Sequence, residues 1–323
     1  MSGMQFRSCL LAALLGLAGC RQSSRPPTDA GAELDGGTAA ACQAWGSPTQ
    51  VGTFTVQPTL SEVSGLAQSA RDPDLLWVHN DSGDAAHLYA LSRDGTLRAV
   101  FGLAGVSARD WEDMARGPCP PGLGTGTAGE SCLFLGDIGD NRAAYPSLLL
   151  HVLPEPQVTP QMDPATPITI APTASITLTY EDGARDSEGL LIDPTGRPWI
   201  VSKGREGPPA VYQVEGTLTA AASLTLRRVF TFAADDLDPS SPLVTAADLD
   251  APGRRLLLRT YDSLLELTLE GDLSAQSLGS ARIRKVPAAI EPQGEAVAWE
   301  PGGQAYLTAS EQIGVLSRVA CTD

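Results

Sequence analysis

Positively charged residues are scarce in this 323-residue sequence, and their scarcity excludes one class of partner. There are 22 lysines and arginines against 38 aspartates and glutamates, which gives a formal net charge of −16. Nucleic-acid binding depends on a basic surface that neutralises phosphates. We therefore expect no nucleic-acid partner, and an acidic balance of this size is otherwise typical of a solvated exterior.

The sequence also lacks the short motifs of several common enzyme classes. No GxSxG nucleophile elbow, HExxH zinc motif or P-loop is present. The usual signatures of serine hydrolases, zincins and nucleotide-binding proteins are therefore missing. No CxxC pair supports a metal–thiolate site either, and no convincing amphipathic helical pattern follows Gln50.

A short apolar run opens the chain, and it is too short to span a bilayer as a mature helix. It follows Arg7 and ends in the letters LAGC at Cys20. This arrangement is typical of a bacterial lipoprotein signal peptide, which predicts removal of residues 1–19 and acylation of the Cys20 thiol. Residues 20–41 are rich in Ser, Pro, Gly, Ala and Asp, so we expect a disordered tether. Arg21, where the enterobacterial sorting rule has Asp for inner-membrane retention, favours the outer membrane by resemblance.

The six cysteines divide once the export signal is recognised. Cys9 is lost with the signal peptide and Cys20 carries the lipid, which leaves four cysteines in an oxidising compartment. Four cysteines allow three pairings. The pairing that we predict joins the two ends of the folded domain and closes one Gly/Pro-rich loop: Cys42 with Cys321, and Cys119 with Cys132.

From Gln50 onward, short β-branched or aliphatic runs alternate with turn residues, which predicts an all-β fold. The runs group into four repeats of four strands and a fifth repeat of three. A Pro-rich insertion interrupts the second repeat between residues 154 and 172. The predicted strands cover residues 50–56, 64–68, 75–79, 87–91, 97–103, 111–115, 132–136, 148–153, 176–180, 188–192, 198–202, 210–214, 226–232, 245–250, 255–260, 264–269, 281–286, 295–299, 304–309 and 313–319.

An acidic head, an apolar strand and a Pro turn recur along the chain. Glu112, Glu188 and Glu295 each stand six residues before a proline, while Ala246 and Ser64 occupy the head in two further copies. Radially repeated four-stranded blades explain this pattern and leave few exposed strand edges. We predict a single β-propeller over residues 42–323 with five blades. The alternative is six, because the interval between Glu112 and Glu188 is long. The strand at 50–56 would complete the last blade and close the ring.

The repeat predicts where a functional site would lie. The first and second strands of a blade form an antiparallel hairpin, so the heads and the ends of the second strands meet at one mouth of the ring. We expect an acidic site at this mouth, built from residues distant in sequence. The catalytic candidates are Glu112, Glu188, Glu295 and His79; the ligand-binding candidates are Lys203, Arg259 and Trp111; the metal-binding candidates are Asp81, Asp137, Asp186 and Glu188.

Converging carboxylates repel one another unless some are protonated or a cation is shared. Oxygen-rich clusters suit Ca²⁺, which is therefore the expected cofactor, and Lys203 and Arg259 would bind an anion. Paired carboxylates could also perform general acid/base catalysis. Three structural alternatives stay open. The loops at 80–84 and 137–141 are also typical hairpin turns, a lone histidine such as His79 is more often structural, and the head glutamates could bond the backbone of the next blade.

Several segments resemble a group of secreted bacterial β-propeller proteins. They are WVHNDSGD, DWEDMA, LGDIGDN, SEGLLID and GEAVAWEP, and the resemblance covers about residues 62–311. The chain is similar more loosely to propellers with phytase-esterase-like activity. In calcium-dependent phytase propellers, acidic residues at the mouth hold Ca²⁺ ions that bind phosphate. That resemblance implies Glu112, Asp137, Glu188 and Glu295 as ligand candidates, but this sequence has fewer bases at the mouth and one blade fewer.

These observations favour a lipid-anchored β-propeller of the bacterial cell envelope with an acidic, Ca²⁺-binding mouth. We expect it to act as a binding or scaffold module for a protein or a small anionic ligand. The alternative is a metal-dependent hydrolase of phosphate esters or glycosides, in which the residues that occur in one blade only, Lys203, Arg259 and His79, would supply the asymmetry that catalysis needs.

Overall fold

The computed structural model describes residues 42–55 and 60–323, and this part of the chain is almost entirely β-structure. Two short helical turns interrupt it, η1 (Ala234–Asp236) and α1 (Ala275–Gly279). No helix in the described residues is long and apolar enough to cross a membrane. The predicted signal peptide, the lipidated Cys20 and the tether lie outside the described residues.

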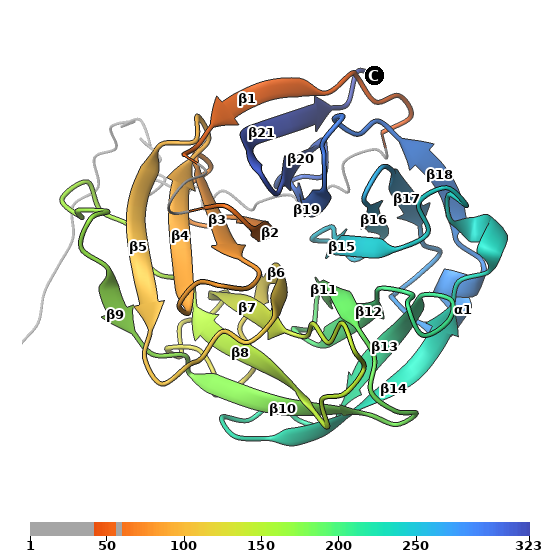
Figure 1. The fold of residues 1–323 in the computed structure, drawn as a ribbon, viewed down its shortest axis with the longest axis horizontal. Coiled ribbons are helices and arrows are strands. Elements are labelled where there is room, and N and C mark those ends of the chain that lie inside the picture. The colour runs from red at the N-terminus through yellow and green to blue at the C-terminus, as the bar shows by residue number, and fades with distance from the viewer. Residues whose placement is uncertain (1–41, 56–59) are drawn as a thin grey trace, which may run out of the picture. The chain divides into compact units, whose positions relative to one another are not determined.

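The strands form four hydrogen-bonded sheets arranged around a common centre (Figure 1). The first runs β2 (Val63–Gln68), β3 (Leu75–Asn80), β4 (His87–Ser92), β5 (Leu97–Leu103) and β9 (Ile168–Ile170). The largest runs β11 (Ser187–Ile192), β12 (Pro198–Ser202), β13 (Ala210–Glu215), β14 (Ser223–Thr231), β10 (Ala174–Tyr180), β8 (Leu148–Pro154), β7 (Ser131–Asp137) and β6 (Trp111–Pro118). The third runs β15 (Val244–Leu249), β16 (Arg255–Thr260), β17 (Leu264–Thr268) and β18 (Arg282–Val286), and the fourth β1 (Thr49–Thr53), β21 (Ile313–Ala320), β20 (Ala305–Ser310) and β19 (Gly294–Trp299).

The eight-stranded sheet consists of two antiparallel halves joined at their outer edges. Strands β6, β7, β8 and β10 form one half and β11 to β14 the other, and β10 pairs parallel with β14 to connect them. The innermost strands β2, β6, β11, β15 and β19 each contact the next, and β19 contacts β2 (Figure 1). All the side chains of β2, β11 and β19 are buried. Buried apolar clusters fill the space between neighbouring sheets and between the two halves of the eight-stranded sheet.

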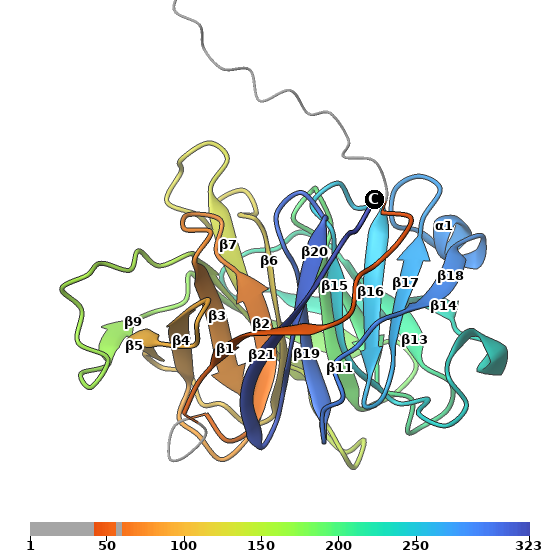
Figure 2. The same cartoon turned by 90° about the horizontal axis from the view of Figure 1, so that it is seen from above.

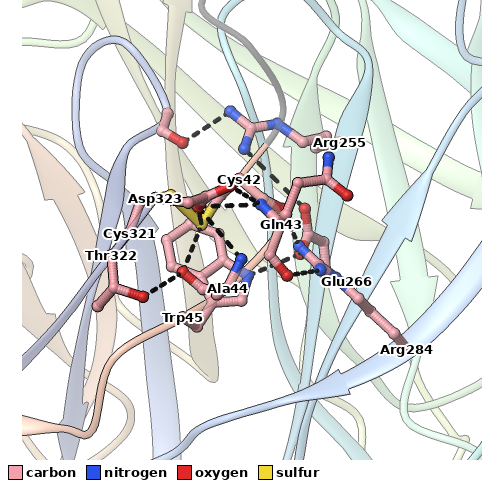
Figure 3. The surroundings of a disulfide bond; sticks show 11 residues. Cys42, Gln43, Ala44, Trp45, Arg255, Glu266, Arg284, Cys321, Thr322 and Asp323 are labelled. Atoms are coloured by element: carbon pink, nitrogen blue, oxygen red, sulfur yellow. Dashed lines mark hydrogen bonds and ion pairs between the residues drawn. A yellow bond between two sulfur atoms is a disulfide. The ribbon is translucent and has the colours of Figure 1, made fainter.

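The two ends of the described chain lie together. Strand β1 pairs antiparallel with β21, and both strands lie beside each other in two perpendicular views (Figures 1 and 2). The disulfide Cys42–Cys321 crosslinks them, and the Asp323 carboxylate accepts hydrogen bonds from the backbone amides of Gln43 and Ala44 (Figure 3). The second disulfide is Cys119–Cys132. Both predicted disulfides are confirmed.

The Pro-rich insertion after β8 contains an element that the sequence pattern did not predict. Its strand β9 is three residues long and pairs parallel with β5, the outer strand of the neighbouring sheet. Three residues are too few to show a period-2 pattern. The conformation of this strand is set instead by the sheet edge that it joins. The insertion thereby covers an edge that would otherwise expose unpaired backbone groups.

Candidate metal centre at the acidic mouth

A β-bulge near the start of every innermost strand sets the direction of the head side chains. The register shifts by one residue at Ser64, Glu112, Glu188, Thr245 and Glu295, each of which has no partner of its own in the ladder. Such a bulge bends the strand and redirects the extra side chain. In the fourth copy the bulged residue is Thr245, so the head assigned from the sequence to Ala246 is wrong by one position.

The bulged residues fall into two chemical groups with different roles. The Ser64 hydroxyl donates to the backbone carbonyl of Glu112, and the Thr245 hydroxyl donates to the carbonyl of Gly294 at 2.6 Å. Both bonds connect one innermost strand to the head of the next. The hydroxyl heads therefore hold neighbouring strands together. The side chains of the three glutamate heads, in contrast, make no hydrogen bond to a backbone group of the described residues.

Carboxylates from three segments of the chain converge around Glu112. Its oxygens lie in a group with those of Asp81 and Asp110, and in a second group with those of Asp186 and Glu188, each group within 4.8 Å. Glu112 and Glu188 come from the bulges of β6 and β11, and Asp81 follows β3. We call these five residues the carboxylate cluster.

Two oxygens of the carboxylate cluster are buried without a hydrogen-bond partner among the described residues. They are Oε2 of Glu188 and Oδ1 of Asp81. Glu188 is only 1% exposed, and its other oxygen, Oε1, accepts from the Lys203 ammonium. A buried carboxylate oxygen without a donor costs free energy unless a proton or a cation compensates it. The cluster therefore has the unsatisfied oxygen ligands that a cation would use.

Burial and mutual repulsion raise the pKa values of these carboxyls. The pKa of Glu112 is raised well above its usual value by burial and by the nearby Glu188, and that of Asp81 is raised to about 7 by burial and by Asp110. Burial alone would lower the pKa of Lys203, but Glu188 more than offsets it and raises this pKa. Without a cation, the cluster is therefore stable only with some of its carboxyls protonated.

Glu295 lies near the carboxylate cluster but outside it. Burial raises the pKa of Glu295 to about 7, and Asp81 repels its charge. Burial likewise raises the pKa of Glu311 to about 7, with repulsion from Glu295 adding to the shift. Gln293 donates to Glu311 at 2.6 Å. These two carboxyls would exchange protons near neutral pH, beside the cluster.

Two of the predicted metal ligands have other partners. Asp137 is fully buried and accepts from the backbone amides of Arg109 and Asp110 at 3.3 Å, and the Arg109 guanidinium lies 3.3 Å from it. Asp137 therefore holds the loop that presents Asp110, and it is not a member of the cluster. Asp186 is a member, but its oxygens also accept from the Asp140 amide at 2.9 Å and the Arg205 guanidinium at 2.8 Å.

Three further candidates are buried and have contacts inside the fold. His79 is fully buried with its ring edge-on to Trp111 at 5.2 Å, and burial lowers its pKa to about 4. Trp111 is 1% exposed and also packs near His151. Arg259 is buried and forms an ion pair with Glu291. The predicted base, aromatic contact and anion-binding arginine are thus packed inside the fold.

Two residues that matter here are not among the site residues predicted from the sequence. Asp110 belongs to the carboxylate cluster, and Asp113 joins three innermost strands, since its buried carboxylate accepts from the amides of Leu190 at 2.8 Å and Ala247 at 3.2 Å. An aspartate inside an otherwise apolar strand was the signal for Asp113. The strand-joining role that was left open for the head glutamates is therefore carried out by Asp113 together with the hydroxyl heads.

The sheets around a common centre define an all-β, propeller-like protein. No protein-family model matches the sequence, and no curated protein matches it. Among solved structures, the chain is similar to a gluconolactonase from Xanthomonas campestris, with a TM-score of 0.48 and 9% identity over 88% of this chain and 92% of that chain. It is also similar to the PQQ-bound aldose sugar dehydrogenase from Streptomyces coelicolor, with a TM-score of 0.45 and 11% identity over 87% and 99%. Because both TM-scores lie below 0.5, neither likeness supports a conclusion about this protein.

Proposed function

We propose that the carboxylate cluster binds a divalent cation, with Ca²⁺ the best match, and that the protein is a cation-dependent hydrolase of phosphate esters or glycosides. The observation that carries the proposal is the buried, partnerless Oε2 of Glu188 within a group of converging carboxylates. Ca²⁺ accepts six to eight oxygen ligands in loose geometry, which suits acidic oxygens supplied by separate loops and bulges.

The residues fit distinct roles in such a site. Asp81, Asp110, Glu112, Asp186 and Glu188 would hold the ion. A bound cation would attract an anionic substrate oxygen and stabilise negative charge that develops on it. Phosphate esters are the preferred substrate class, because an uncompensated acidic mouth repels a phosphate and a cation reverses that repulsion.

Glu295 and Glu311 are the candidates for proton transfer. Both stand beside the carboxylate cluster with pKa values raised to about 7 by burial. A general acid or base works best when its pKa lies near the working pH. Lys203 holds Glu188 in place through its ion pair and adds positive charge beside the cluster.

A binding or scaffold module is the second candidate function. It is favoured because both predicted anion-binding bases are tied to carboxylates, Lys203 to Glu188 and Arg259 to Glu291. The same cation site would then hold a partner's acidic group or order the mouth, without turnover.

We further propose an architecture and a location. Counting the eight-stranded sheet as two blades and β1 as the outer strand of the last gives five blades. The domain from Cys42 onward would be displayed on the cell envelope, anchored to the outer membrane by the lipid on Cys20.

The hydrolase proposal is tested by measuring the turnover of p-nitrophenyl phosphate esters and p-nitrophenyl glycosides in about 1 mM Ca²⁺. We expect Glu295→Gln to lower kcat by about a hundredfold, the loss typical of a general acid or base, with an unchanged melting temperature. The exposed Glu270 supplies the control Glu270→Gln, which should keep full activity. Turnover that survives both chelation and Glu295→Gln would contradict the proposal, and Ca²⁺ binding without any turnover would favour the binding module.

A further inference from the structure

A second opening lies where the innermost strands end, at the opposite end of these strands from the carboxylate cluster. A cavity of about 370 Å³ occupies it. This volume falls within the usual range for small-molecule sites. All five innermost strands contribute lining residues at or near their ends: Gln68, Arg116, Ile192, Asp248 and Trp299.

The cavity wall is stiff and poor in backbone donors. Three of the prolines that follow the repeated heads by six residues line it, namely Pro118, Pro194 and Pro301. Proline has a fixed φ angle and no backbone N–H. Apolar groups of Ile192 and Leu249 complete part of the wall, so any polar ligand must be held by side chains.

Among the residues that the structure describes, Arg116 is the one basic residue lining this cavity. No hydrogen bond or salt bridge joins its guanidinium to another described residue, although its charge attracts the nearby carboxylate of Asp248, and the side chain is half-buried. A guanidinium has five N–H donors in a planar fork that fits a carboxylate. The indole N–H of Trp299, another lining residue, is also buried without an acceptor. The cavity therefore has unused donors.

The acidic residues of the same wall already have donors of their own. Glu300 accepts from the guanidinium groups of Arg93 and Arg318, which together outweigh its charge. Asp248 is buried and accepts from the backbone amides of Leu249 and Trp299 at 2.8 and 2.7 Å.

Two further wall carboxylates are bound within their own turns. Asp193 accepts from the Thr195 hydroxyl at 2.6 Å and from the Trp199 indole at 3.1 Å, and Glu130 accepts from the Thr125 amide at 2.6 Å. The groups of the cavity wall that have no hydrogen-bond partner are therefore donors. A bound anion would accept hydrogen bonds from them, whereas a cation would not.

We propose that this cavity binds a small organic monocarboxylate through a bidentate pair with Arg116. The apolar and proline-lined wall suits the organic part of such a ligand. The neighbouring Asp193, Asp248 and Glu130 disfavour a doubly charged phosphate more than a singly charged carboxylate. The site is independent of the carboxylate cluster, so it stands whether or not the hydrolase proposal holds.

Calorimetric titration of the purified full chain with benzoate, in buffer freed of metal by a chelating resin, tests the site. We expect saturable benzoate binding that Arg116→Gln weakens about tenfold to a hundredfold, the loss expected for a charge-assisted hydrogen-bonded pair. Arg116→Lys keeps the charge but loses the planar fork, so it should bind with intermediate affinity. Arg98→Gln removes an exposed arginine from β5 and should leave binding unchanged.

Three results would overturn the proposal. They are no benzoate binding to the wild-type chain, equal affinity in Arg116→Gln, and tighter binding of inorganic phosphate than of benzoate. If the melting curve shows that Arg116→Gln does not fold, the benzoate affinity of Arg116→Lys tests the proposal instead. An affinity equal to that of the wild type would exclude a bidentate contact. A weaker affinity would support one.

Discussion

Replacing Cys42 and Cys321 together by serine is expected to lower the free energy of unfolding by about 3 to 5 kcal/mol. The bridge joins residues separated by 279 positions and crosslinks the ends of the described domain. A disulfide limits the conformational freedom of the unfolded chain, and the limit grows with the length of the loop that it closes. Urea unfolding monitored by tryptophan fluorescence measures the change.

The second disulfide provides a matched control within the same protein. Cys119 and Cys132 are separated by only 13 positions, so the paired serine substitution there should cost about 2 kcal/mol less than at Cys42 and Cys321. An equal or larger loss at the short bridge would show that the pairing of β1 with β21 already holds the ends, with little contribution from the crosslink.

Asp113→Ala is expected to lower the free energy of unfolding by about 3 kcal/mol or more. The substitution leaves the buried amides of Leu190 and Ala247 without an acceptor, and each unsatisfied buried group costs about 1 to 3 kcal/mol. Because these amides belong to two other innermost strands, the loss would loosen the centre of the domain. Thermal and urea unfolding both measure it.

Glu112→Gln, one residue earlier on the same strand, is the control for that prediction. Removing this charge relieves burial cost and repulsion from Glu188, so the metal-free variant should be at least as stable as the wild type. If Glu112→Gln lowers the free energy of unfolding as much as Asp113→Ala does, the head glutamates join neighbouring strands, and the case for a metal site is weaker.

The strands were predictable from the sequence because the turn signals and apolar runs are regular. Each predicted strand has a counterpart, and most bounds agree within two residues. The short elements β9 and α1 were not predictable: neither has enough residues for a period, and each depends on the edge or loop that it joins. The bulges leave no local sequence pattern either, which is why the repeat assigns Ala246, and not Thr245, to the position of Glu188.

The acidic mouth was predictable as a whole, but not the assignment of each side chain. The repeat placed Glu112, Glu188 and Asp186 together, and the structure brings them within one cluster. Sequence alone could not show that Trp111 and Arg259 turn into the packed interior. Burial depends on neighbouring strands that are distant in the chain, so no local pattern reports it.

Thermal unfolding of the chelated protein, titrated with Ca²⁺, tests the metal centre most directly. Binding to the folded state stabilises it by RT ln(1 + [L]/Kd), about 2.7 kcal/mol at a hundredfold excess over Kd. We expect a clear rise in the melting temperature that Glu188→Gln abolishes and Glu270→Gln preserves. No rise at millimolar Ca²⁺, or a rise that persists in Glu188→Gln, would contradict a cation site at the carboxylate cluster.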